Sequence, residues 1–164
     1  MNLESQEAKP SVPREDDPRY VLDALLMTHD AVVLASTGGP YSPWLLGAYF
    51  VHEGPHLFLF LEREGKTRAN LAENASVALL VSDNDATKDF VQARGTVRLL
   101  DDAQEPVVRQ KLLAKMPWYA TYTPVVPVCI EITEAFVSSL GRGWFPAKRI
   151  GFEAALTPLP QPPP

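Results

Sequence analysis

The sequence predicts a mainly β protein, an antiparallel barrel of short strands with two or three short helices. About eight short apolar segments follow one another at regular spacing, and residues that favour turns, such as Gly, Pro, Asn and Asp, separate them. Such a series is typical of antiparallel barrels, because parallel βαβ sheets place a long helix between successive strands. The chain of 164 residues is long enough for one domain with its own core.

Three segments have helical patterns. The first begins at Pro18, which suits a first helical turn, and its apolar residues at 21, 22, 25 and 26 share one face. The second is short and covers 66–74. The third, 103–115, is the clearest amphipathic helix, and Pro117 ends it. Its apolar face is expected to consist of Val107, Val108, Leu112 and Met116.

The strands fill the intervals between turns. They are expected at 31–36, 44–51, 56–61, 76–82, 90–100, 126–132, 135–140 and 144–150. Gly95 lies in the middle of the long segment 90–100, which suggests a bulge or a bend there.

Both ends differ in composition from the segment between them. Residues 1–17 lack apolar periodicity, so we expect a disordered segment. Residues 153–164 form a proline-rich tail, which cannot donate enough backbone hydrogen bonds for a helix or a central strand and should be extended. The barrel domain is expected to span 18–152.

Composition and charge argue against several classes of function. The net charge of −5 argues against general nucleic-acid binding. Cys129 is the single cysteine, and the three histidines have no ligand-like spacing, so neither a disulfide nor a metal cluster is expected. No apolar run approaches the roughly 20 residues that cross a bilayer. The polar, acidic N-terminus does not resemble a signal peptide, and we expect a cytoplasmic protein.

No catalytic arrangement of nucleophile and base is visible in the sequence. Ser138 and Ser139 lack the G-x-S-x-G context, and Cys129 lies in an apolar segment, as an inert core residue would. A protein of this kind often leaves its reactivity to a bound cofactor.

A polar turn, Gly65-Lys66-Thr67-Arg68, joins a strand to the second helix. Free N–H groups and the positive end of the helix dipole meet two cations and a hydroxyl there, which suits a phosphate group. The same pattern also suits a solvated basic turn between two core strands.

A second cluster follows the strand at 135–140. Glycines on both sides of Arg142 permit close backbone approach, and Trp144 with its neighbour Phe145 could offer a flat surface to a heteroaromatic ring. The alternative is a β-turn followed by a tryptophan that anchors the core.

These residues resemble a known family, the pyridoxamine 5′-phosphate oxidase-like superfamily of FMN-binding split barrels. The resemblance covers about residues 18–152 and rests on the strand and basic turn at 57–68, the Asn70-Leu71 pair, Asn74 and the strand after it. Residues 111–150 are similar to the branch that contains haem-utilisation proteins. The Arg-Leu-x-Pro ending of true pyridoxamine 5′-phosphate oxidases is absent, which argues against that particular activity.

The resemblance implies an antiparallel split β-barrel that binds FMN at a homodimer interface and acts as an oxidoreductase on a small molecule. Deazaflavin, haem or no cofactor are the alternatives for the ligand, and a non-catalytic flavin- or haem-binding or sensing protein is the alternative for the function. The implied cofactor-binding residues form three groups: Lys66, Thr67, Arg68 and Asn70 at the phosphate; Phe60, Leu61 and Glu62 beside the ring; and Arg142 and Trp144, supplied by the second subunit.

Overall fold

The computed structural model describes residues 14–153 and shows a mainly β, antiparallel half-barrel with three α-helices in that range. Most of the predicted N-terminal segment and nearly all of the proline-rich tail lie outside the described residues. The strands are β1 (Ala31–Ser36), β2 (Trp44–Tyr49), β3 (Val51–Glu53), β4 (His56–Glu62), β5 (Ser76–Val81), β6 (Phe90–Leu99), β7 (Val125–Ser139) and β8 (Trp144–Gly151). The helices are α1 (Pro18–Thr28), α2 (Lys66–Glu73) and α3 (Glu105–Lys115), the last preceded by a 3₁₀ turn (Asp102–Gln104).

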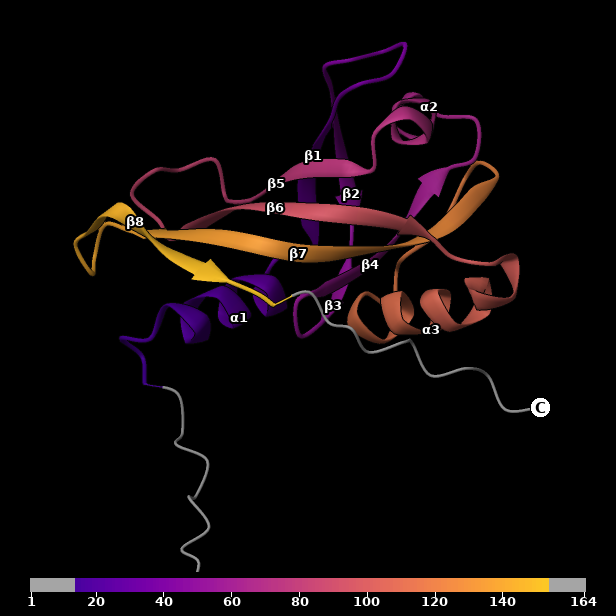
Figure 1. Ribbon diagram of the computed structural model, residues 1–164. Helices are drawn as coiled ribbons and strands as arrows, with labels where there is room; N and C mark the ends of the chain where they lie inside the picture. Colours follow the sequence, from indigo (N-terminus) through magenta and orange to yellow (C-terminus); the bar gives the residue numbers. More distant parts are fainter. Residues whose placement is uncertain (1–13, 154–164) are drawn as a thin grey trace, which may run out of the picture.

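All eight strands belong to one sheet, which curls on itself. The strand order is β2-β1-β5-β6-β7-β4-β3, with β8 paired to β7, and every pair is antiparallel. The end strands β2 and β3 are separated in the chain by one residue, Phe50, so the two edges of the sheet must come together. The result is the split barrel that the sequence predicts. Figure 1 shows α1 and α3 below the long β6 and β7 strands and α2 above them.

Two strand boundaries differ from the prediction. The expected strand 44–51 breaks at Phe50, whose side chain is completely buried and whose backbone N–H donates to the Asp30 carbonyl (2.9 Å). The expected strands 126–132 and 135–140 are instead one strand, β7. Its pairing with β6 shifts register between Arg94 and Gly95, so Thr133 is an extra residue in the ladder. The bulge predicted at Gly95 is therefore present, and a side chain at 95 would meet the Glu131 carbonyl oxygen (2.8 Å).

The barrel interior and the outer face under α3 form two separate cores. The predicted apolar face of α1 is confirmed, since Val21, Leu22, Leu25 and Leu26 are all buried against the barrel interior. The face of α3 was predicted less accurately. Val108, Leu112 and Met116 pack with Phe60 of β4, but Val107 is 45% exposed because it lies on the solvent side of the helix.

Lys115, at the end of α3, joins three segments through backbone carbonyls. Its ammonium donates to the carbonyl oxygens of Leu26 (3.1 Å), His29 (2.5 Å) and Phe50 (3.2 Å), and it lies 4.1 Å from the centre of the Phe50 ring. Burial lowers the pKa of the Lys115 ammonium below its ordinary value. The lysine thereby fixes α3 to the end of α1 and to the bend between β2 and β3.

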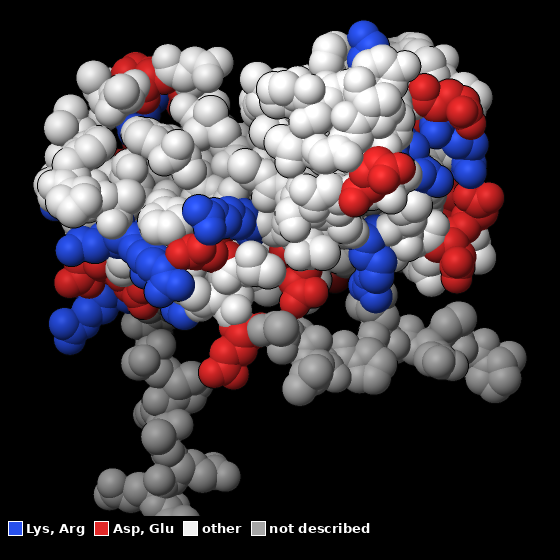
Figure 2. Space-filling model, turned by 45° about the horizontal axis from the view of Figure 1, so that its top comes forward, with Lys and Arg blue, Asp and Glu red and all other residues white. Residues whose placement is uncertain are grey.

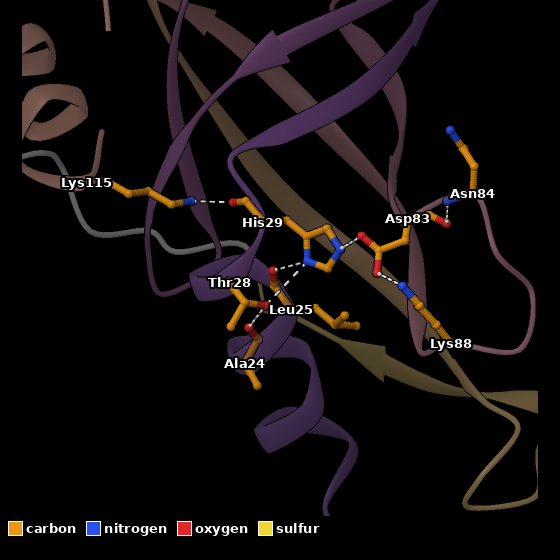
Figure 3. Close-up of polar contacts among 9 residues, drawn as sticks. Ala24, Leu25, Thr28, His29, Asp83, Asn84, Lys88 and Lys115 are labelled. Carbon is orange, nitrogen blue, oxygen red and sulfur yellow. Dashed lines mark hydrogen bonds and ion pairs between the residues drawn. The ribbon is translucent and has the colours of Figure 1, made fainter. Parts of the chain in front are cut away.

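The His29 side chain continues this connection toward the loop after β5 (Figure 3). Its Nδ1 lies 3.0 Å from the Leu25 carbonyl oxygen, and its Nε2 lies 3.2 Å from a carboxylate oxygen of Asp83. Lys88 pairs with the other oxygen of Asp83 (3.4 Å). The C-terminal end of α1 is thus tied both to α3 and to the β5–β6 loop.

Candidate functional site

A pocket of about 320 Å³ opens between β2, the end of β4 and the start of α2. One wall is apolar and consists of Trp44 and Leu46 from β2. The opposite wall is polar. It is lined by Glu62, Glu64, Gly65, Lys66 and Thr67. The pocket therefore contains the turn in which the sequence predicts an anion site.

The start of α2 leaves its first N–H groups without acceptors within the helix. Gly65 is the N-cap residue, no side chain among residues 14–153 caps this end, and the first turn contains no acidic residue. A side chain at position 65 would come 2.9 Å from the Cβ atom of Glu62, so the close approach of β4 requires glycine. The uncapped N–H groups and the helix dipole favour a negative charge at this end of the pocket.

Two buried polar atoms at this helix start have no hydrogen-bond partner among the described residues. They are the Thr67 hydroxyl and Nε of Arg68. Thr67 is only 4% exposed and is one of the residues that line the pocket. Most buried polar groups in proteins are hydrogen-bonded, and an unpaired one costs about 1–3 kcal/mol. A ligand that accepts a hydrogen bond from Thr67 would remove that cost.

Lys66 lies against aromatic rings. Its Nζ is 4.2 Å from the centre of the Trp44 ring and 5.7 Å from that of Tyr41. Nothing in the sequence pattern singles out Trp44, because it is 22 residues from Lys66 and begins an ordinary apolar strand. The structure brings the two together and adds Trp44 to the residues of the site.

Asn70 is completely buried and lies behind the pocket. Its Nδ2 donates to the Ser36 hydroxyl (3.2 Å), and its Oδ1 accepts from the backbone N–H of Tyr41 (2.9 Å). Gly39 packs directly on it, since a Cβ atom there would be 2.3 Å from the Cα atom of Asn70. Asn70, predicted as a cofactor-binding residue, thus holds the β1–β2 turn against α2.

The side chains of Phe60 and Leu61 lie elsewhere than at the pocket. Phe60 stacks on Tyr119, with 6.3 Å between the ring centres. The Arg109 guanidinium lies 4.9 Å from the centre of the Phe60 ring. Leu61 is 2% exposed and belongs to the barrel interior. Of the three residues expected beside a cofactor ring, Glu62 is the one that lines the pocket.

Arg142 and Trp144 lie at the far end of β7. Glu62 pairs with Val125 at one end of this 15-residue strand, and Ser139 pairs with Trp144 at the other. At about 3.3 Å per residue, more than 40 Å of strand separates them. The Arg142 guanidinium bonds to Asp89 (2.7 Å), and Trp144 is buried in the core, as in the alternative interpretation of this cluster. Within one chain, this turn is therefore remote from the pocket.

His, Cys, Asp and Glu side chains do not gather into a metal site among residues 14–153. No group of three or more His, Cys, Asp or Glu side chains in this range could hold a metal ion. Cys129 is a free, buried cysteine, and burial raises the pKa of its thiol, so it is the core residue that the sequence predicts. Within the same range, no helix is long and apolar enough to cross a membrane.

The fold and the pocket define a split-barrel protein with a candidate anion site at the barrel opening. The chain belongs to the pyridoxamine 5′-phosphate oxidase family, because the family model with that description matches residues 21–122, more than half of the chain. Among curated proteins, no sequence matches this chain.

Solved structures with other descriptions share the fold. A haem-binding protein from Mycobacterium smegmatis is 13% identical, with a TM-score of 0.63 over 87% of this chain and 60% of its own. An F420 reductase is 21% identical, with a TM-score of 0.58 over 69% of this chain and 94% of its own. An FAD-binding protein from Mesorhizobium loti is 19% identical, with a TM-score of 0.56 over 71% of this chain and 90% of its own. At such identities the likeness concerns the fold alone.

Proposed function

We propose that the protein is a flavoprotein oxidoreductase that binds FMN, with the phosphate group at the start of α2. The observation that carries the proposal is the buried Thr67 hydroxyl, which lacks a partner at an uncapped helix start beside the Lys66 cation. A phosphate offers acceptors for this hydroxyl and for the free N–H groups, and its charge suits Lys66 and Arg68. The residues present therefore fit the group.

Several features of the pocket suit the rest of such a ligand. Leu46 offers an apolar surface, and the carboxylates of Glu62 and Glu64 can accept hydrogen bonds from ligand hydroxyl groups. When bound, FMN would supply hydride or electron transfer, while these residues bind and orient it. Related folds include proteins described as an F420 reductase, an FAD-binding protein and a haem-binding protein, which supports a cofactor site of this general kind.

The phosphate site is tested by titrating the protein with FMN and with riboflavin, which lacks the phosphate. Lys66→Met should weaken FMN binding about ten- to a hundredfold, because a charge-assisted contact contributes roughly 1.5–3 kcal/mol. Riboflavin affinity should hardly change. Equal FMN affinity in the wild type and the variant would contradict the proposal.

Thr67→Val is the matched second variant, since valine has nearly the same shape but no hydroxyl. It removes an unpaired buried group, so the free protein should be as stable as the wild type or more stable. FMN binding should nevertheless weaken, because the ligand loses a donor. Reduction of bound flavin by NAD(P)H, followed by reoxidation by a substrate, would distinguish an oxidoreductase from a protein that only binds or senses flavin.

We further propose that two copies of the chain associate through the outer face of the sheet formed by β2, β1, β5 and β6. A shallow pocket of about 410 Å³ on this face is lined largely by apolar side chains, among them Val33, Leu45, Leu80 and Phe136. Leu45 is 66% exposed. Contiguous exposed apolar surface is typical of protein interfaces. Figure 2 shows uncharged side chains over much of the face that it presents, with charged side chains mainly toward its lower and right edges and smaller groups at the upper left, at the top and left of centre.

Leu45→Glu should therefore convert a dimer into a monomer of 18.1 kDa, because a charge would have to be buried at the interface. Light scattering at micromolar concentration measures the change. Leu113→Glu is the control, since Leu113 is a partly exposed leucine on α3, away from this face. A wild-type protein that is already monomeric would overturn the proposal.

A further inference from the structure

We propose that Trp44 and Tyr41 form an aromatic seat that positions the Lys66 ammonium for phosphate binding, so that Trp44 sets the affinity of the site without being its charged partner. This inference rests on the proposed phosphate site and concerns how its cation is held. The seat is defined by the two distances from Lys66 Nζ to the ring centres, 4.2 Å for Trp44 and 5.7 Å for Tyr41.

Aromatic rings are the neighbours of the Lys66 ammonium in this arrangement. Glu62 and Glu64 line the same pocket, yet no carboxylate among the described residues lies within ion-pair distance of Lys66. The aromatic faces attract the cation through their quadrupoles but carry no net charge. A lysine that pairs with a carboxylate must give up that partner to bind an anion, whereas Lys66 keeps its full charge available.

The rings are placed by a rigid support that does not itself touch the pocket. Asn70 accepts from the Tyr41 N–H and donates to Ser36, and Ser36 is the cross-strand partner of Trp44. Asn74, the residue that follows α2, donates from its side-chain amide to the Thr37 hydroxyl in the β1–β2 turn (3.3 Å). The β1–β2 turn is therefore docked along the helix that also carries Lys66, which keeps the backbone that bears the rings close to the backbone of the lysine.

Holding a lysine in place reduces the conformational freedom that it would otherwise lose on binding an anion. A cation–π contact at a partly exposed site corresponds to about a two- to fivefold change in an equilibrium constant. Trp44→Leu should accordingly lower the affinity for FMN and the affinity for inorganic phosphate by the same factor, two- to fivefold. Trp44→Phe keeps an aromatic face and should recover most of the loss.

The first measurement needs no ligand. Lysines are reductively methylated with ¹³C, which retains their charge, and the Lys66 methyl signal is identified by its absence in Lys66→Met. In the wild type this signal should be displaced by the ring current of the indole. The displacement should disappear in Trp44→Leu and partly persist in Trp44→Phe. If the Lys66 signal were the same in Trp44→Leu as in the wild type, the proposal that Trp44 positions Lys66 would be wrong, whatever the ligand is.

The second measurement is a double-mutant cycle with FMN and with inorganic phosphate. In the Lys66→Met background, Trp44→Leu should have no further effect, because the seat acts through the lysine. An effect that persists in that background and occurs with FMN alone would overturn the proposal, since Trp44 would then contact the body of the ligand. Trp118→Leu is the control, because Trp118 is 58% exposed and packs on Tyr49 (5.0 Å between ring centres). Wild-type protein that binds neither ligand would overturn the proposed function, and the methyl signal would still decide on the seat.

Discussion

Replacing Gly39 by alanine is expected to destabilise the protein by about 1–3 kcal/mol, the usual cost of overpacking a tight contact. The added Cβ atom would lie 2.3 Å from the Cα atom of Asn70 and 2.5 Å from its Oδ1. Backbone cannot move aside as a flexible side chain can, so the β1–β2 turn must separate from α2. The free energy of unfolding in urea measures the change, and FMN affinity should fall with it because Tyr41 and Trp44 move away from Lys66.

Gly151→Ala is the matched control for this prediction. Gly151 ends β8, and no atom of the described residues stands within 4 Å of the position that its Cβ atom would occupy. Alanine there should leave stability unchanged or raise it slightly, because glycine loses more backbone entropy on folding. If both variants lost stability equally, the contact between Gly39 and Asn70 would not be the cause.

Lys115→Met is expected to cost about 3 kcal/mol of unfolding free energy. Methionine fills similar space but cannot donate, so the carbonyls of Leu26, His29 and Phe50 lose a charged partner at once. Denaturant unfolding of both proteins measures the difference. Because the lysine joins α1, α3 and the bend at Phe50, the loss should appear as a lower transition midpoint of the whole domain.

Lys111→Met separates this role from the general effect of removing a charge from α3. Lys111 lies one turn earlier on the same helix and pairs with Glu53, which is more than half exposed. Partly exposed ion pairs of this kind usually contribute less than about 1 kcal/mol. Equal losses in the two variants would contradict the special role of Lys115.

The fold could be predicted where local pattern and packing agree. The spacing of Val21, Leu22, Leu25 and Leu26 anticipates the buried face of α1, and Gly95 anticipates the bulge. The prediction failed where packing between distant segments decides. Phe50 ends β2 because its side chain enters the core beneath Lys115, 65 residues away in the chain. No local pattern contains that contact.

The same distinction holds for the candidate site. The Gly65-to-Arg68 turn could be proposed from the sequence because helix start, hydroxyl and cations are neighbours in the chain. The position of Trp44 beside Lys66 could not be predicted, because it depends on the contact of Asn70 with the β1–β2 turn. The strand before the turn is apolar at nearly every position, so its two faces could not be told apart. The structure assigns Leu59 and Leu61 to the barrel interior and Phe58 and Phe60 to the face under α3.

The middle of β7 is held by neighbours on both sides. Residues 128–131 pair with β4 along one edge and with β6 along the other, whereas β2 and β3 each have an open edge toward the split in the barrel. Local opening of a protein begins where few hydrogen bonds must break. We therefore expect local opening of the barrel to occur at the split. The amide protons at the centre of β7 should exchange with solvent only when the whole domain unfolds.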